Sequence, residues 1–248
     1  MKKKLLLAIA AVALATAGPA QGAGLSLTGE TGVARTPVAM TLPPLGLAVG
    51  GDLFASSDLF VPMRAEIGLI EGLEVGANYW YEDTTGSPTL WGVNAKYQIP
   101  AGMDEALALA AGVNYQSYSA DGGIDVGTTK VYGVLSYTWE TRFTFTPSAG
   151  FSYEIQSGDR GDSGIRFFAN FLAQITPKLA LGAEFNSTNS DLDGEDADSD
   201  LWVGARFWPR ENLAIQGGFI NNADLSDGGF DSKFTVHAGA QYSFSLTK

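Results

Sequence analysis

The sequence predicts an all-β protein that folds as a transmembrane, antiparallel, up-and-down β-barrel of about twelve strands. Twelve segments alternate apolar and polar residues with the period of two that belongs to a strand with two different faces. Short turns alternate with longer polar loops between these segments, and aromatic residues cluster near both ends of the segments. A barrel whose outer face meets lipid and whose inner face is polar accounts for the three observations together.

The first 22 residues have the organisation of a secretory signal peptide. Lys2, Lys3 and Lys4 form a charged region, an apolar run extends to Ala17, and residues 20–22 form a small-residue cleavage site. The apolar run is too short to cross a bilayer as a helix, so a retained anchor helix is the weaker alternative. Residues 1–22 therefore predict export and leave about 225 residues, the size of one domain.

Composition narrows the class of protein. The chain has no Cys, so it can be neither a lipoprotein nor a disulfide scaffold. Its mean hydropathy of +0.04 fits a soluble protein, or a barrel that dilutes each lipid-facing residue with an interior one. The formal charge of −12 argues against nucleic acid as a partner.

Residues 23–44 precede the first regular strand. The stretch 32–40 (GVARTPVAM), followed by Leu42-Pro43-Pro44 and Gly46, loosely resembles the opening of some barrel proteins linked to exopolysaccharide export. Proline has no N–H to donate to a sheet, so this segment is a poor candidate for a central strand. We expect it to enter the barrel interior from the periplasm, or to add a partial strand.

The twelve predicted strands occupy residues 45–55, 61–70, 73–82, 89–99, 105–117, 129–139, 142–155, 165–175, 178–187, 200–208, 212–221 and 233–245. Segment 142–155 shows the alternation clearly, with Phe151 and Tyr153 on one face and Ser152 and Glu154 on the other. Pro147 interrupts the pattern, and we expect a bulge or a bound water there.

The connections define two ends of the barrel. Short turns are predicted at 71–72, 140–141, 176–177 and 209–211, with a slightly longer one at 100–104, and longer loops at 83–88, 118–128, 156–164, 188–199 and 222–232; residues 56–60 belong with the loops. Short turns in the periplasm and longer loops outside are typical of outer-membrane barrels, which places both termini in the periplasm. Two aromatic belts are expected, one on the turn side (Tyr137, Trp139, Phe143, Phe207, Tyr242, Phe244) and one toward the loops (Tyr79, Tyr81, Trp91, Tyr153, Phe185, Phe219, Phe234).

The last strand carries a recognisable motif. His237, Gly239, Tyr242 and Phe244 follow the spacing of the C-terminal signal of bacterial outer-membrane β-barrels, and on these residues the chain resembles that class of proteins. The resemblance implies insertion into the outer membrane of a Gram-negative bacterium by the barrel-assembly machinery, with membrane lipid and lipopolysaccharide as neighbours. A soluble β-sandwich would explain the alternating strands, but it leaves the signal peptide, the loop asymmetry and the terminal aromatics unexplained. The oligomeric state is not predicted.

The inner face of the predicted strands carries charges of both signs. The residues with this parity are Asp52, Arg64, Glu66, Glu74, Glu82, Lys96, Lys130, Glu140, Arg142, Glu154, Arg166, Glu184, Arg206 and Lys233, and the single histidine, His237, shares their face. Opposite charges can pair across strands and fill a narrow interior. They can equally line a water-filled path and set its selectivity. The sequence leaves both arrangements open.

The chain also carries residues suited to catalysis and to metal binding. Outer-membrane hydrolases mostly use a His with Ser, Asp or Glu, but His237 lies near mid-strand rather than at the outer rim, so we interpret the protein as non-enzymatic. In the loop 191–200, carboxylates alternate around a glycine, and the candidate Ca²⁺ ligands are Asp191, Asp193, Glu195, Asp196 and Asp198. A solvated acidic loop is the alternative, because Trp202 stands where the last ligand of a helix–loop–helix calcium loop would be Glu. No other cofactor is predicted.

These observations predict an outer-membrane β-barrel that acts as a passive channel for small solutes. The alternative is a structural or surface-interaction barrel that works through its acidic loops without transporting anything. A lipid-modifying outer-membrane enzyme is the third interpretation.

Overall fold

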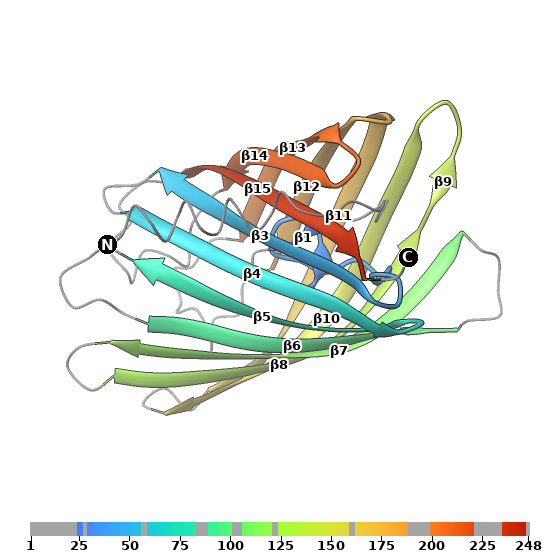
Figure 1. Ribbon diagram of the computed structural model, residues 1–248. Coiled ribbons are helices and arrows are strands. Elements are labelled where there is room, and N and C mark those ends of the chain that lie inside the picture. Colours follow the sequence, from blue (N-terminus) through green and yellow to red (C-terminus); the bar gives the residue numbers. More distant parts are fainter. Residues whose placement is uncertain are drawn as a thin grey trace.

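The computed structural model describes residues 24–26, 29–55, 59–82, 89–100, 106–120, 124–158, 162–187, 199–220 and 235–246. Within these ranges twelve long antiparallel strands close into a barrel, which confirms the predicted fold (Figure 1). The strands are β3 (Gly46–Ala55), β4 (Leu59–Ile70), β5 (Leu73–Glu82), β6 (Thr89–Ile99), β7 (Leu107–Ala120), β8 (Ile124–Tyr137), β10 (Thr144–Gly158), β11 (Ser163–Thr176), β12 (Leu179–Asn186), β13 (Asp200–Arg210), β14 (Leu213–Ile220) and β15 (Thr235–Ser245). No helix of the described ranges is long and apolar enough to cross a bilayer.

The barrel closes between its first and last wall strands. Each strand pairs with its neighbours along the chain, and β15 pairs with β3, with His237 opposite Phe54 and Tyr242 opposite Val49. The β10–β11 pairing completes the ring on the other side. A closed ring has no sheet edge, so strand pairing satisfies the backbone groups that an open sheet would expose to lipid.

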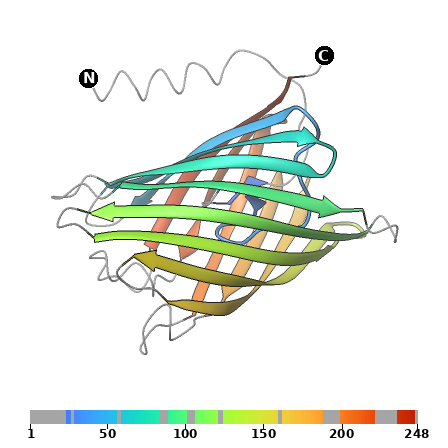
Figure 2. The ribbon, with the colours of Figure 1, turned by 90° about the horizontal axis from the view of Figure 1, so that it is seen from below.

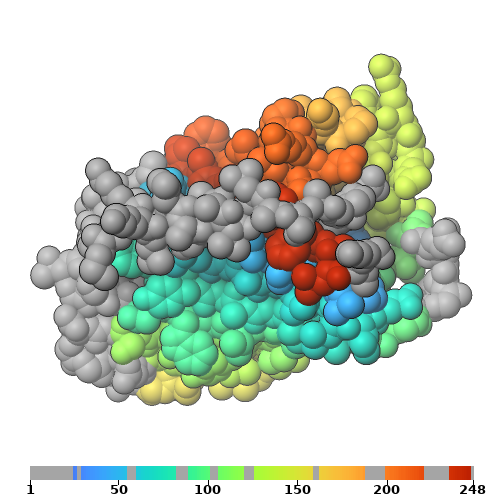
Figure 3. All heavy atoms as spheres, in the orientation of Figure 1, coloured from blue at the N-terminus to red at the C-terminus, as the bar shows by residue number. Residues whose placement is uncertain are grey.

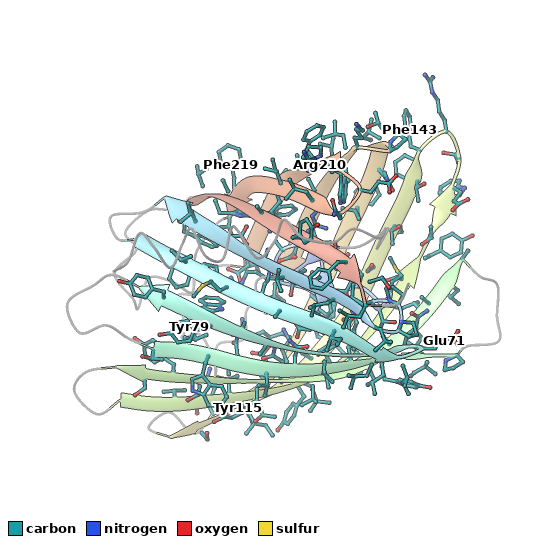
Figure 4. The ribbon with its side chains drawn as sticks, in the orientation of Figure 1. Glu71, Tyr79, Tyr115, Phe143, Arg210 and Phe219 are labelled. Atoms are coloured by element: carbon teal, nitrogen blue, oxygen red, sulfur yellow. The ribbon has the colours of Figure 1, made fainter. Side chains whose placement is uncertain are left out.

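The two faces of the wall differ as the alternation predicts. Outward side chains are mostly apolar and exposed, as for Leu135 at 46 % and Phe219 at 60 %, whereas Ser136, next in the chain, is 1 % exposed. Figure 4 shows Tyr79, Tyr115 and Phe219 toward one end of the wall, and Phe143 toward the other. In the space-filling view the side chains of β4, β5 and β6 form a continuous outer surface (Figure 3).

The two ends of the barrel differ in the connections that they carry. The turn end carries the turns 71–72, 141–143, 177–178 and 211–212, and the opposite end is the loop end. The loops predicted at 118–128 and 156–164 are wrong in extent: β7 and β8 continue to Ala120 and from Ile124, and β10 and β11 leave only 159–162 between them. Backbone pairing does not need apolar side chains, so the strands extend past the residues on which the alternation was recognised.

Pro147 lies opposite a break in the neighbouring strand. The β10–β11 register runs through Pro147 without a shift, so the bulge expected there is not found in this pairing. On the other side β8 stops at Tyr137, and a separate two-residue strand, β9 (Trp139–Glu140), pairs with Thr144 and Phe145. A proline beside this gap removes no hydrogen bond from a continuous ladder.

Candidate functional site: the occupied barrel interior

A segment of the chain itself lies inside the barrel. We call residues 24–26 and 29–44 the inner segment; it contains the short strands β1 (Gly24–Leu25) and β2 (Thr31–Gly32), which pair with each other. The segment lies within the ring of wall strands in two perpendicular views (Figures 1 and 2). This is one of the two arrangements expected from the sequence for residues 23–44.

Within the inner segment, residues 29–42 form a hairpin with its tip toward the loop end, and residues 24–26 fold back along its first arm. Gly32 and Pro37 form an antiparallel bridge at the tip, and the β1–β2 pairing joins the folded-back residues to the first arm. Leu25 and Leu42 pack with Ala48, near the start of β3 at the turn end. Val33 instead packs in a cluster with Phe54 and Trp202, which lie near the loop ends of β3 and β13. The two arms of the hairpin therefore share the turn end, and residues 33–36 form its tip.

One carboxylate binds the tip. Glu184 on β12 accepts hydrogen bonds from the backbone N–H groups of Ala34 (3.0 Å), Arg35 (2.9 Å) and Thr36 (3.0 Å), and from the Thr36 hydroxyl (2.9 Å). Successive N–H groups that converge in this way form a nest, a recurrent anion-binding arrangement. The Arg35 guanidinium adds an ion pair of 2.5 Å with Asp200 on β13. The tip is thus bound to two adjacent wall strands.

A buried ion pair holds both arms of the hairpin. Lys96 Nζ and Glu74 Oε1 are 2.8 Å apart and both side chains are fully buried. Glu74 also accepts hydrogen bonds from the Thr31 hydroxyl (2.6 Å) and the Leu42 N–H (2.8 Å), and Lys96 donates to the carbonyls of Thr31 and Val38 (3.0 Å each). Each charge of the pair therefore has the additional hydrogen bonds that burial of an ion pair requires.

Further polar wall residues bind the inner segment mostly through its main chain. Arg206 donates to the Val33 carbonyl, Asn170 to the Pro37 carbonyl and the Thr36 hydroxyl, and Asn114 to the Glu30 carboxylate; Ser136 accepts from the Ala39 N–H and Gln241 from the Leu25 N–H. The neutral residues of this group were missed from the sequence, because only charged side chains were singled out. They have the same inward parity, which was the signal available to find them.

A second network surrounds His237 in the wall. Asp52 pairs with Arg64, accepts a hydrogen bond from Gln216 at 2.9 Å, and lies 3.3 Å from His237 Nδ1. The Trp202 indole N–H donates to His237 Nε2 at 2.6 Å. Nε2 is therefore the unprotonated ring nitrogen, and Nδ1 carries the proton that faces Asp52.

A third group lies on β8, β10 and β11. Lys130 Nζ is 3.5 Å and Arg166 Nε 3.1 Å from the two carboxylate oxygens of Glu154, so one anion joins two cations. The side chain of Lys130 remains 19 % exposed, more than either of its partners. Lys130 is therefore the charged wall residue of this group that has most access to solvent.

Most of the residues predicted for the interior are buried there. Buried inside are Asp52, Arg64, Glu66, Glu74, Lys96, Glu154, Arg166, Glu184, Arg206 and His237, and Lys130 is half-buried. Arg142 is a correction: it lies in the exposed turn 141–143, with its guanidinium 5.6 Å from the Phe143 ring centroid, and Glu140 is exposed too. The strand predicted from residue 142 begins only at Thr144, so the alternation that placed Arg142 inside does not apply to it.

Other predicted residues lie outside what the structure describes. These are the signal peptide, the side chain of Glu82, the residue Lys233, and the candidate metal ligands Asp191, Asp193, Glu195, Asp196 and Asp198. In the described ranges no group of three or more His, Asp or Glu residues is placed to hold a metal ion.

The residues of the closing-strand motif have identifiable contacts. The Asp52 carboxylate lies where a side chain on Gly239 would begin, so only glycine fits at that inward position. The Tyr242 hydroxyl accepts a hydrogen bond of 2.6 Å from Asn212 in the 211–212 turn, and the Tyr242 and Phe244 rings are 6.1 Å apart. The motif thus joins strand closure to the His237 network.

Comparison with known proteins places the fold. No protein-family model matches the sequence, and no curated protein does. Among solved structures, the KdgM porin in complex with disordered oligogalacturonate is 11 % identical, with a TM-score of 0.59 over 80 % of this chain and 99 % of its own. The NanC porin is 12 % identical (TM-score 0.57, 79 % and 98 %), and the Acinetobacter baumannii outer membrane protein Omp33 is 16 % identical (TM-score 0.53, 81 % and 98 %). The likeness to exopolysaccharide-associated barrels is not shown by these comparisons. The chain has the fold of a bacterial outer-membrane β-barrel of porin type.

Proposed function

We propose that the protein is an outer-membrane channel for small polar solutes, exported by its signal peptide and inserted with both termini in the periplasm. The turn end then faces the periplasm and the loop end faces the cell exterior. One observation carries the proposal: an apolar outer face encloses an interior to which each of the twelve wall strands contributes at least one buried polar or charged side chain. A wall of this kind tolerates water, whereas a purely structural core would be expected to be apolar.

The solved structures support the same proposal at the level of architecture. The KdgM structure contains an oligogalacturonate, so a barrel of this architecture can accommodate a charged soluble ligand. In the present chain the inner segment occupies part of the barrel interior, which narrows any route for a solute. The Lys130 side chain on β8 keeps partial access to solvent. We also propose that His237 has no catalytic role, because Trp202 and Asp52 occupy its two ring nitrogens.

Single-channel recording in planar bilayers tests the proposal. Purified full-length protein should give stepwise conductance, and Lys130→Glu should shift the reversal potential in a salt gradient toward cations. Lys130→Arg is the matched control, because it keeps the charge and should leave the reversal potential unchanged. Folded protein that produces no steps, even when its inner segment has been shown to be accessible, would refute the channel.

The alternative is a barrel without a transport role. The observation that favours it is the extensive hydrogen bonding of the inner segment at its tip and along both arms. A silent barrel whose inner segment never becomes accessible would support this alternative.

A further inference from the structure

We propose that the inner segment is a releasable gate of the barrel, and that Glu184 is the residue that holds the gate closed. The proposal rests on the channel function above, and it adds the mechanism by which the path opens. Four features of the structure support it.

The inner segment is not part of the wall. Its strands β1 and β2 pair with each other and, through Gly32, with Pro37 of the same segment, and the twelve wall strands pair among themselves from β3 to β15. Release therefore requires no wall strand pair to break.

Most of the wall charges that bind the inner segment also have partners on the wall. Lys96 pairs with Glu74 at 2.8 Å, and Arg206 donates to Gln216 at 3.0 Å. These contacts persist when the inner segment leaves, and water can replace the main-chain groups of the segment. For these residues release does not create an isolated buried charge.

Glu184 is different. Every hydrogen bond that its carboxylate accepts from the described residues comes from Ala34, Arg35 or Thr36. Asn170, its register partner on β11, donates to Thr36 and Pro37 instead. The charge of Glu184 is thus stabilised by the tip of the inner segment, and charge-assisted hydrogen bonds are about twice as strong as neutral ones. Neutralising this one side chain weakens all contacts of the nest at once.

The backbone is held in place where the inner segment joins β3. Leu45 has a φ of 58°, the left-handed region that a leucine rarely adopts, and its N–H donates to the Gly68 carbonyl on β4 at 2.7 Å. The Gly46 N–H donates to the Pro43 carbonyl at 2.8 Å. Movement is therefore confined to residues before Pro43, which include the whole tip.

The test uses the full-length protein, which has no natural Cys. Ala34→Cys introduces a single buried thiol at the tip, and its reaction with a membrane-impermeant maleimide measures release. Glu184→Gln should raise the labelling rate by about tenfold, because it removes the charge assistance of the nest. Glu154→Gln is the matched control: Glu154 is also a buried interior carboxylate, but its ion pairs are with Lys130 and Arg166 of the wall. Thr36→Val provides a second variant if Glu184→Gln fails to fold, because Thr36 belongs to the inner segment and not to a wall strand.

A disulfide provides the converse experiment. The Ala39 N–H donates to the Ser136 hydroxyl at 2.8 Å, so Ala39→Cys with Ser136→Cys should crosslink the inner segment to β8. Glu184→Gln should also increase the conductance, because the released segment no longer fills the interior. The crosslink should abolish this increase, and a reductant should restore it. Equal labelling of Ala34→Cys with Glu184, with Glu184→Gln and with Thr36→Val would overturn the gate while leaving the channel intact. Increased labelling without conductance would overturn the channel and leave the release of the segment established.

Discussion

The Trp202 indole N–H donates a hydrogen bond of 2.6 Å to Nε2 of His237 and thereby fixes the tautomer of the only histidine in the chain. The bond joins β13 to β15 across β14, and Asp52 on β3 continues the network beyond the point of barrel closure. Trp202 also belongs to the apolar cluster that contains Val33 of the inner segment. The His237 network therefore supports both the closure of the wall and the surface on which the tip rests.

His237→Leu should destabilise the folded barrel by about 1–3 kcal/mol, because the buried Trp202 N–H loses its acceptor and the Asp52 carboxylate loses one of its donors. Urea unfolding in lipid or detergent, followed by tryptophan fluorescence, measures the change. Trp202→Phe should also destabilise the barrel, and the double variant should lose less than the two single losses together, since both remove the same bond. Strictly additive losses would show that the bond contributes nothing.

Leu135→Arg should destabilise the barrel by about 2–4 kcal/mol, since it places a charge on the lipid-facing side of β8. Leu135→Ala is the control that separates lost packing from added charge. If the two variants unfold at the same urea concentration, position 135 does not face lipid. Ser136→Arg, which the alternation alone would predict to be mild, should instead displace the inner segment, because Ser136 is 1 % exposed and bonded to Ala39.

A stop after Gln241 should abolish stable insertion into the outer membrane. It removes the pairs from Tyr242–Val49 to Ser245–Gly46 and leaves that part of β3 as an open edge, where each unpaired backbone group in lipid costs several kcal/mol. The amount of heat-modifiable protein in outer-membrane fractions measures the effect. A stop after Leu246, which keeps the whole of β15, is the control and should insert normally; normal insertion of the shorter chain would contradict the prediction.

The loop 191–200 should gain protection from protease in the presence of about 10⁻⁴–10⁻³ M Ca²⁺ if it forms the predicted site, since extracellular calcium sites have affinities in this range. Mg²⁺ should protect it poorly, because it demands a tighter octahedral geometry. Replacing Asp191, Asp193 and Asp196 by Asn should remove the protection and leave the barrel folded. Equal cleavage with Ca²⁺, Mg²⁺ and chelator would leave the solvated acidic loop as the explanation.

The sequence by itself determined the wall of this protein. Because a strand directs successive side chains to opposite faces, the alternation around Leu135 and Ser136 assigned each of them to lipid or interior without knowledge of the neighbouring strands. The same rule misplaced Arg142, since it holds only within a strand, and β10 begins at Thr144, two residues later than predicted. The polarity of Glu74, Lys96 and Glu184 could be read, but not whether water or protein would meet them.

Only the tertiary structure decided what fills the barrel. Glu184 and Thr36 are separated by 148 positions in the chain, and Glu74 and Thr31 by 43, with no periodic pattern linking either pair. The inner segment has few regular elements, and the wall binds it mostly through main-chain groups that are the same at nearly every residue. Such contacts depend on where the backbone passes rather than on side-chain identity, so the sequence could suggest a segment inside the barrel but not the carboxylate that binds its tip.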